Sequence, residues 1–229
     1  RDSRRDSQFA FHRTCLSERV SVARILITSG PTRQYLDPVR YLTNASSGRM
    51  GAALAEAVLS LGHEAVVISG PVEVAYPADA TVIDVVSTEE MLAAARQAFA
   101  DCVGLIGAAA PCDYRPLRVE SHKIAKTGQP LELSLIETED IVATLAAEKG
   151  QRWVVGFALE TEDHRLRALA KLERKHCDLM VSNGVAAMDA LDNQVEILDP
   201  AGNILKQVAG TKLFVAQEIL AVIAERLLS

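Results

Sequence analysis

The stretch TNASSGRMGAALAEAVLSL, residues Thr43 to Leu61, decides the fold class. It comes soon after the apolar run RILITSG, which starts at Arg24 and is typical of a buried strand. Its apolar residues follow the helical spacing i, i+3, i+4, i+7, i+8, i+11, namely Met50, Ala53, Leu54, Ala57, Val58 and Leu61. A strand, a glycine-bearing turn and a helix in this order often hold a phosphate, yet the G-x-G-x-x-G fingerprint is missing.

Apolar runs of strand length alternate with helical segments along the rest of the chain. We expect strands at Arg24–Thr28, Glu64–Ser69, Thr81–Val86, Val103–Ala108, Trp153–Ala158 and Asp178–Ser182, and helices at Ser47–Leu61, Thr88–Ala100, Glu139–Glu148 and Asp163–Lys175. Because the apolar runs are continuous rather than alternating, both faces of the sheet should be covered. The pattern predicts a doubly wound, Rossmann-like α/β domain with a mostly parallel sheet, whose ligands gather beyond the carboxyl ends of the strands.

Local signals predict several element ends. Ser87 and Glu90 have the spacing of a capping box at the start of the second helix, and Ser46 or Ser47 is the N-cap that we expect for the first. Near the C-terminus, VEILDPAGNILKQV predicts a β-hairpin around Pro200–Asn203, followed by a last helix from Thr211.

The composition bounds the class of protein. The 229 residues are 49% hydrophobic and 24% charged, with a net charge of -6 and only 4% aromatic residues. An acidic chain with few aromatic side chains argues against a nucleic-acid surface, and no apolar run is long enough to span a membrane. Four scattered cysteines without C-x-x-C spacing indicate reduced thiols in the cytoplasm.

The N-terminal segment differs in character from the rest. Residues 1–22 are rich in arginine and lack periodicity, so we expect a basic leader or linker that is poorly ordered. Residues 23–229 should form a single nucleotide-binding domain.

The turn before the first helix can hold a ligand or only cap the helix. Gly48 and Gly51 allow a close approach to the backbone, and the first turn of a helix offers unpaired N–H groups to a phosphate. The alternative is a plain cap with a glycine packed on the strand. The preceding loop, Ser29–Asn44, runs about 16 residues where such connections usually have about 2–6, and this length favours a functional loop.

Three further segments have both a functional and an ordinary interpretation. GAAAPCDYRP follows the fourth strand and places Asp113 near Arg115, either beside a flat ligand or as a surface ion pair. Lys123 and Lys126 could close over a triphosphate or lie on a solvated strand edge. Lys171 and Lys175 stand at i, i+4 on one helix face, and the simplest interpretation is that this face is exposed to solvent.

The combination of segments is more specific than any one of them. The series SGPTRQYLDPVRYLTNASSGRMG, AAAPCDYRP, HKIAK, TEDI, VVGFALET, AKLERKHCDLMVSN and the late Lys212 stands in one order from about Arg24 to the C-terminus. In this order and spacing the chain resembles the phosphopantothenoylcysteine synthetase family, the phosphopantothenate–cysteine ligases of coenzyme A biosynthesis.

The resemblance implies an amide synthesis in two steps. Such enzymes activate the carboxylate of 4′-phosphopantothenate with a nucleoside triphosphate, usually CTP in bacteria, and release pyrophosphate; the amine of cysteine then displaces the nucleotide. It also implies Mg²⁺ with the CTP or ATP, a lysine-bearing flap and a homodimer. Family members often carry an N-terminal flavin-dependent half, and from the length of this chain we expect no flavin.

The resemblance also assigns roles to positions of this sequence. Asn44 and Lys123 match catalytic residues, with Asn44 at the acyl group and Lys123 on the flap. Nucleotide contacts match Gly30, Ser46, Gly48, Gly51, Ala108, Ala109, Asp113, Asp140, Ile141, Phe157, Lys171, Lys175 and Asn183, and phosphopantothenate contacts match Arg40, Asn44, Ala109, Ala110 and Asp113. Arg40 matches an arginine that reaches the neighbouring subunit's site. The histidines lack the spacing of metal ligands, so Mg²⁺ should bind mainly to the triphosphate.

The sequence departs from the family pattern at four places. The flap reads Lys-Ile-Ala-Lys from Lys123 rather than Lys-Ile-Lys-Lys, and TEDI, ending at Ile141, lacks the usual proline. Pro111-Cys112 replaces Val-Ala, and an Asn-x-x-x-Phe element is missing after Asn183. These departures bear on rate and nucleotide preference more than on the fold. Without a neighbouring histidine, Cys112 is expected to be a small packing residue and not a nucleophile.

Two other classes of function stay open. The sheet pattern alone also fits a nicotinamide-dependent oxidoreductase, although the glycine fingerprint and the acid that closes the second strand are both absent. A non-catalytic nucleotide-binding homologue would keep the fold and explain the altered flap.

Overall fold

The strand order of the central sheet is doubly wound. The computed structural model describes residues 22–160, 164–184 and 192–228, so the predicted leader lies outside this range apart from Val22. Its main sheet has eight strands in the order β12-β11-β10-β9-β6-β1-β4-β5. The parallel strands are β1 (Arg24–Ser29), β4 (Glu64–Ser69), β5 (Thr81–Asp84), β6 (Gly104–Gly107), β9 (Trp153–Glu160) and β10 (Leu179–Gly184).

The sheet ends in the predicted C-terminal hairpin. β11 (Asp192–Leu198) runs antiparallel to β10, and β12 (Ile204–Thr211) runs antiparallel to β11. The six parallel strands, numbered by their order in the chain, lie as 3-2-1-4-5-6, which is the doubly wound arrangement expected from the sequence.

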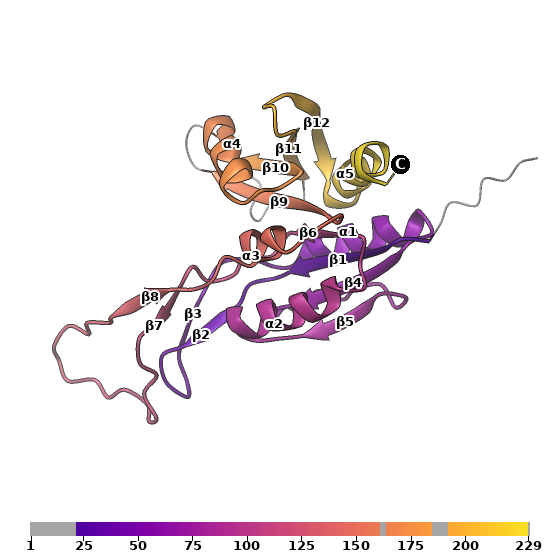
Figure 1. Ribbon diagram of the computed structural model, residues 1–229. Coiled ribbons are helices and arrows are strands. Elements are labelled where there is room, and N and C mark those ends of the chain that lie inside the picture. The colour runs from indigo at the N-terminus through magenta and orange to yellow at the C-terminus, as the bar shows by residue number, and fades with distance from the viewer. Residues whose placement is uncertain (1–21, 161–163, 185–191, 229) are drawn as a thin grey trace, which may run out of the picture.

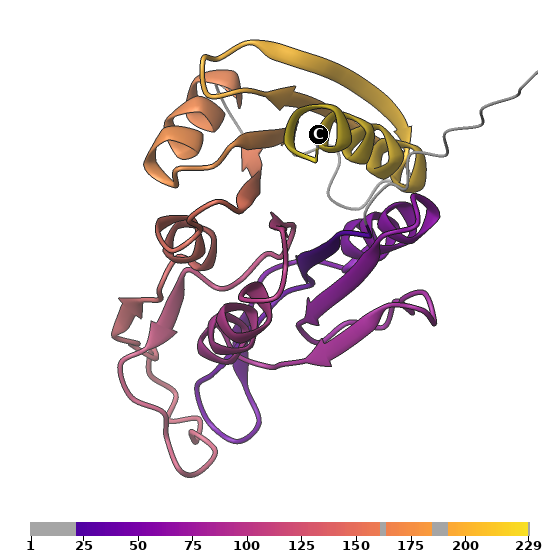
Figure 2. The same ribbon diagram turned by 45° about the vertical axis from the view of Figure 1, so that its right-hand side comes forward.

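Helices cover both faces of the sheet, as the continuous apolar strands predict. α1 (Arg49–Ser60) and α5 (Lys212–Leu227) lie side by side on one face (Figure 2), and α2 (Thr88–Phe99), α3 (Ile141–Ala147) and α4 (His164–Arg174) cover the other. Within β1, Ile25 and Ile27 join the apolar cluster under α1 and α5, whereas Leu26 joins the cluster on the opposite face. Each fully buried side chain of this size stabilises the fold by about 1.5–3 kcal/mol.

The long segment after β1 is not the plain loop that the sequence predicted. It contains the antiparallel pair β2 (Arg33–Tyr35) and β3 (Tyr41–Thr43), in the register Gln34 to Leu42. A second pair, β7 (Tyr114–Pro116) and β8 (Leu135–Glu137), projects from the body with it, and we call the two pairs with their connecting segments the arm (Figure 1). Strands of three residues are too short to show alternation, which is why the pattern did not reveal them.

The predicted start of α2 is confirmed. Ser87 Oγ accepts the N–H of Glu90 at 3.1 Å, and Glu90 Oε2 accepts the N–H of Ser87 at 3.4 Å, which is the expected capping box. Among the residues that the structure describes, no helix combines the length and the apolarity that crossing a bilayer requires.

Candidate active site

The site lies where the strand order reverses, between β1 and β6. The loops that leave these two strands are held together: Ala110 donates its N–H to the carbonyl of Gly30 at 2.9 Å, and Cys112 donates its N–H to Thr32 Oγ1 at 2.8 Å. Such a reversal opens a crevice beyond the carboxyl ends of the strands, which is where the sequence predicted that ligands gather.

The first helix begins without a side-chain cap, contrary to the expected serine cap. Its N-cap is Gly48, with φ of 72°, and no side chain accepts a hydrogen bond from the first turn. Gly48 adopts the left-handed conformation, which an L side chain rarely takes, and α1 starts later than a cap at Ser46 or Ser47 would require. The first intrahelical bond runs from the N–H of Ala52 to the carbonyl of Gly48, so the preceding N–H groups of the first turn have no acceptor within the helix.

A cavity of about 460 Å³ lies against this helix start, and we call it the α1 cavity. Its walls come from the turn before α1, the loop after β6, the ends of β9 and β10, and the starts of β11 and α5. They include Asn44, Ser46, Gly48, Gly51, Ala108, Ala109, Ala110, Asp113, Phe157, Lys171, Asn183, Asn193 and Lys212.

A second cavity, of about 470 Å³, lies against α3 and is called the α3 cavity. It is lined by Ala109, Cys112, Asp113, Glu137, Asp140, Ile141, Phe157, Arg174 and Lys175, among others. Ala109, Pro111, Asp113 and Phe157 line both cavities, so one short wall separates two spaces that are each large enough for a small charged ligand.

Asn44 is fastened to the shared wall. Its Nδ2 donates to the carbonyls of Ala110 at 3.3 Å and of Pro111 at 2.9 Å. These two bonds use the Nδ2 donors of the carboxamide. The exposed side chain therefore stands at the boundary of the two cavities, where a reacting group would lie.

Two buried amide oxygens in the α1 cavity lack partners. Within the described ranges, Asn183 Oδ1 and Asn193 Oδ1 are buried and accept no hydrogen bond, and Asn193 is only 3% exposed. An unpaired buried polar group costs about 1–3 kcal/mol, so a bound ligand that hydrogen-bonds these amides would offset that cost.

Most of the residues assigned by resemblance are brought together, and three are not. Gly30, Arg40 and Lys123 line neither cavity. Gly30 lies in the turn after β1, where its carbonyl accepts the N–H of Ala110, and it has a φ of 76°. Arg40 and Lys123 lie on the arm, and Lys123 lines a third cavity there, between Leu36 and Ser134. The two lysines of α4 are also divided, because Lys171 lines the α1 cavity and Lys175 the α3 cavity.

An ion pair sits at the floor of the α3 cavity. Lys175 Nζ lies 3.0 Å from Asp140 Oδ2, and Asp140 Oδ1 accepts the N–H of Ala143 at 3.1 Å as the N-cap of α3. Asp140 thus orients both the helix start and the lysine. Charged groups of both signs therefore line this space.

Comparison with known proteins decides the family. The sequence profile of the DNA/pantothenate metabolism flavoprotein C-terminal domain matches residues 20–227. The chain belongs to this family. It is 40% identical over 203 residues to a cysteine/cysteine sulfinic acid decarboxylase from an unknown prokaryotic organism, covering 86% of this chain and 56% of the relative. It is also 40% identical over 185 residues to the coenzyme A biosynthesis bifunctional protein CoaBC of Vibrio vulnificus, covering 78% and 46%.

A solved structure shows the same fold. The crystal structure of the C-terminal domain of a CoaBC protein superposes with a TM-score of 0.77 at 37% identity, covering 90% of this chain and 95% of that one. The chain spans about half the length of the two sequence relatives, at 56% and 46%. The doubly wound sheet is therefore the architecture of this DNA/pantothenate flavoprotein C-terminal family.

Sequence reasoning missed two cavity residues of this family member. Asn193 opens β11 and Lys212 opens α5, and both line the α1 cavity. Lys212 was noticed only as part of a motif, and Asn193 lies at the end of the segment in which a different motif was sought. Their distance along the chain from the other site residues concealed them. The antiparallel pairing of β11 with β10, in which Val195 lies opposite Asn183, brings the start of β11 to the cavity.

Cys112 borders the α3 cavity as a packed thiol. It is buried, its Sγ donates to the carbonyls of Thr32 and Leu42 at 3.4 Å each, and this burial raises the pKa of the thiol. Burial likewise raises the pKa of Cys102 to about 11 and that of Cys177 to about 12. The described thiols are therefore protonated near neutral pH, which disfavours a cysteine nucleophile.

We expect Cys112→Ala to keep the turnover number within about threefold of the wild type, because the change removes one small packing group. Cys102→Ala, at a buried thiol far from the cavities, is the matched control for the loss of volume. A turnover number reduced as far as that of a site variant would make the thiol a participant in the chemistry.

The described residues contain no group of three or more His, Cys, Asp or Glu side chains that could hold a metal ion. Separate carboxylates nevertheless face the α3 cavity, including Asp113 and Asp140. Oxygen ligands in small number suit a Mg²⁺ ion that arrives with a nucleotide and keeps most of its ligands from phosphate and water.

Proposed function

We propose that this chain is a phosphopantothenate–cysteine ligase of coenzyme A biosynthesis, working in the cytoplasm. The single observation that carries the proposal is the pair of cavities divided by one short wall, Ala109 to Asp113, with Asn44 at the boundary. A ligase of this kind must hold two anionic substrates side by side and join them. The family membership and the likeness to a CoaBC C-terminal domain support the same assignment.

The proposed reaction has two steps. A carboxylate oxygen of 4′-phosphopantothenate attacks the α-phosphorus of the nucleoside triphosphate, the bond to the bridging oxygen breaks, and pyrophosphate leaves. The amine of cysteine then attacks the acyl carbon, loses a proton, and displaces the nucleoside monophosphate as the amide forms. A carboxylate is a poor electrophile, so this activation is what makes the amide accessible.

The cavities divide the work between them. In the α3 cavity, Phe157, Ile141 and Asp113 would hold the nucleoside, with Lys175 and Arg174 toward its phosphates. In the α1 cavity, the uncapped N–H groups that follow Gly48 would bind phosphate oxygens, as the helix dipole favours. Asn44 would hold the acyl group between the two. We propose CTP as the nucleotide, and Mg²⁺ would neutralise its triphosphate beside Asp113.

The arm supports a homodimer. Its exposed apolar residues include Val39, Leu117, Val119, Leu131, Leu133 and Leu135, and Leu117 is 61% exposed. Apolar side chains gathered on a projecting element are typical of an interface. We propose that a second copy of this chain covers them and that Arg40 approaches the neighbour's site. Sedimentation equilibrium tests this part of the proposal by comparing the particle mass with the chain mass.

The decisive experiment supplies phosphopantothenate, CTP, Mg²⁺ and cysteine and follows pyrophosphate and the amide product. We expect pyrophosphate only when phosphopantothenate is present, and amide only when cysteine is added. Replacing CTP with ATP at equal concentration measures nucleotide preference. Nucleotide binding without turnover would favour a non-catalytic homologue. A change in the absorbance of NAD would favour an oxidoreductase, and release of CO₂ from cysteine alone would favour a decarboxylase.

Replacing Asn193 should separate stability from substrate binding. Asn193→Leu removes a buried amide whose oxygen accepts no hydrogen bond from the described residues, so the melting temperature should stay equal or rise. The KM for phosphopantothenate should rise about tenfold, the effect of losing one hydrogen-bond acceptor for a hydroxyl or amide N–H of the substrate. Thermal melts and initial rates check the two effects.

The matched control is Asn203→Leu. Asn203 donates to both carboxylate oxygens of Asp199 in the β11–β12 turn, from its N–H at 2.8 Å and its Nδ2 at 3.0 Å. It should lose stability with an unchanged KM, the opposite pattern. If Asn193→Leu instead melts early with an unaltered KM, the amide is structural and takes no part in binding.

A further inference from the structure

The tip of the β2–β3 hairpin is a tight loop organised by one carboxylate. Leu36 donates its N–H to the carbonyl of Arg40 at 2.8 Å, and Asp37 Oδ1 accepts the N–H groups of Val39 and Arg40 at 2.8 Å each. Side-chain acceptors of this kind fold short loops by replacing backbone acceptors. One oxygen of Asp37 is thus used to shape its own loop.

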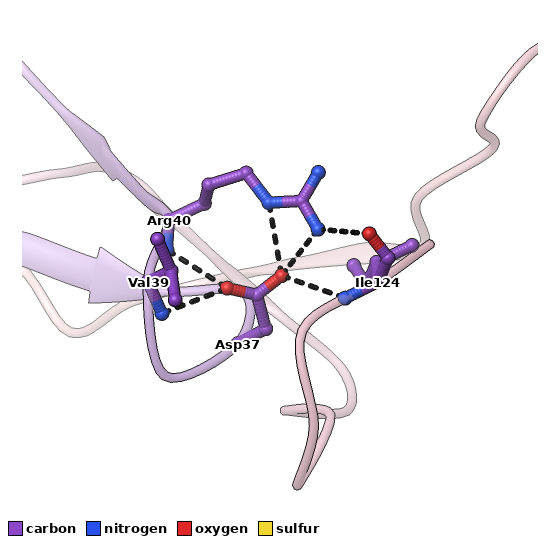
Figure 3. A network of polar contacts seen from close by, with 4 residues as sticks. All are labelled: Asp37, Val39, Arg40 and Ile124. Carbon is purple, nitrogen blue, oxygen red and sulfur yellow. Dashed lines mark hydrogen bonds and ion pairs between the residues drawn. The ribbon is translucent and has the colours of Figure 1, made fainter. Parts of the chain in front are cut away.

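The other oxygen of Asp37 reaches a distant segment of the chain. Asp37 Oδ2 accepts Arg40 Nε at 2.9 Å, Arg40 Nη2, and the N–H of Ile124 at 3.1 Å (Figure 3). Asp37 is fully buried, and a carboxylate is rarely buried in this way unless it is paired. Ile124 directly follows Lys123, the flap lysine of the proposed ligase.

The peptide group of Ile124 is held from both sides. Its N–H bonds to Asp37, and its carbonyl accepts Arg40 Nη2 at 2.7 Å. A second tie lies just ahead of the lysine, where Glu120 donates its N–H to the carbonyl of Leu36 at 2.9 Å. The loop therefore grips the backbone on either side of Lys123, and we call Asp37, Arg40 and the Ile124 peptide the clasp.

The clasp depends on the charge of Asp37. Burial opposes ionisation, but the Arg40 guanidinium and the N–H groups of Ile124, Val39 and Arg40 hold the pKa of Asp37 well below its usual range. The carboxylate therefore stays ionised at physiological pH and can accept all of these hydrogen bonds. Asparagine in its place would turn an amide donor toward the donors of Arg40 or Ile124.

We propose that Asp37 is a positioning residue for the ligase reaction, which makes the flap lysine and Arg40 move as one unit. Arg40 and Ile124, the neighbour of Lys123, are 84 residues apart in the chain, and the clasp joins them through the side chains of Asp37 and Arg40. The inference rests on the proposed function, because it assigns the clasp to the step in which Lys123 would neutralise charge on the nucleotide.

The test compares Asp37→Asn with Asp199→Asn in the full chain. Asp199 caps the β11–β12 turn through Asn203, and it controls for the loss of a turn-forming carboxylate far from the flap. We expect Asp37→Asn to slow pyrophosphate release about 100-fold, the effect of a misplaced catalytic group. Aminolysis of separately prepared acyl-nucleotide should stay near the wild-type rate, because that step does not need the triphosphate to be neutralised.

A double-mutant cycle identifies the route of the effect. If Asp37 acts through Lys123, adding Asp37→Asn to Lys123→Ala should produce little further loss of the residual rate. Equal losses with and without Lys123 would overturn the proposal, and so would an Asp37→Asn variant with wild-type pyrophosphate release.

Hydrogen exchange tests the clasp without any substrate. The amide of Ile124 should exchange at least about tenfold faster in folded Asp37→Asn than in the wild type, and Asp199→Asn should leave it unchanged. Unchanged protection at Ile124 would overturn the clasp even if the ligase assignment holds. A wild-type protein that releases no pyrophosphate would remove the ligase, while the exchange result would still report on the clasp.

Discussion

Lys123→Ala should lower the rate of pyrophosphate release at least about 100-fold, toward the detection limit. Loss of one preorganised group that stabilises transition-state charge costs about 100- to 1,000-fold in rate. The side chain is exposed on the arm, so its truncation should leave the melting temperature within measurement error. Quantifying pyrophosphate in a single turnover, with phosphopantothenate and CTP but no cysteine, isolates the affected step.

The neighbouring flap lysine provides the matched control for Lys123. Lys126 is exposed on the same segment, and Lys126→Ala removes the same charge three residues away. It should retain most of the activity, since the clasp fixes the backbone at Ile124 and not beyond it. Wild-type pyrophosphate release from Lys123→Ala, or an equal loss from both variants, would show that position 123 has no special role.

Gly51→Ala should both destabilise the fold and weaken substrate binding. A Cβ at this position would lie 1.9 Å from Ser29 Oγ and 2.4 Å from Ser29 Cβ, so α1 would have to move away from β1. The higher helix propensity of alanine stabilises the fold by about 1 kcal/mol at most, whereas overpacking destabilises it by about 1–3 kcal/mol or more. A net loss of about 1–2 kcal/mol should lower the melting temperature by roughly 2–8 °C in a domain of this size.

The displacement in Gly51→Ala also moves the uncapped N–H groups of α1, so the KM for phosphopantothenate or nucleotide should rise about tenfold or more. Gly62→Ala, beyond the other end of the same helix, is the control. An added Cβ there meets nothing within 4 Å, and its φ of 79° makes the substitution costly only through backbone strain. It should destabilise the fold with an unchanged KM. A Gly51→Ala enzyme with both wild-type properties would refute the tight packing at Ser29.

The fold was predictable where local pattern and global layout agree. The apolar run from Ile25 and the stripe from Met50 to Leu61 each encode their element within a few residues, and they appear as β1 and α1. The hairpin in the loop after β1 was not predictable, because its strands, Arg33–Tyr35 and Tyr41–Thr43, have only three residues each and are too short to show an alternating pattern. Their pairing depends on the Asp37 loop, which no periodicity records.

The candidate site was predictable in composition more than in geometry. The resemblance supplied Asn44, Asp113 and Phe157, which do meet around the shared wall. It could not show that Lys123 lies outside both cavities, or that Asn193 lies within one, because both facts depend on contacts between distant segments. The expected serine cap failed for a simpler reason: Gly48 turns the backbone where a serine would have had to bond.

The wall shared by the two cavities sets the stoichiometry of the proposed reaction. Because Ala109, Pro111 and Asp113 border both spaces, the acyl-nucleotide would be made and consumed without crossing bulk solvent. Loss of the acyl-nucleotide by hydrolysis would then depend on how long it stays bound before cysteine arrives, and not on its escape into solvent. One nucleotide should be spent per amide when cysteine saturates, with the ratio climbing as cysteine runs short.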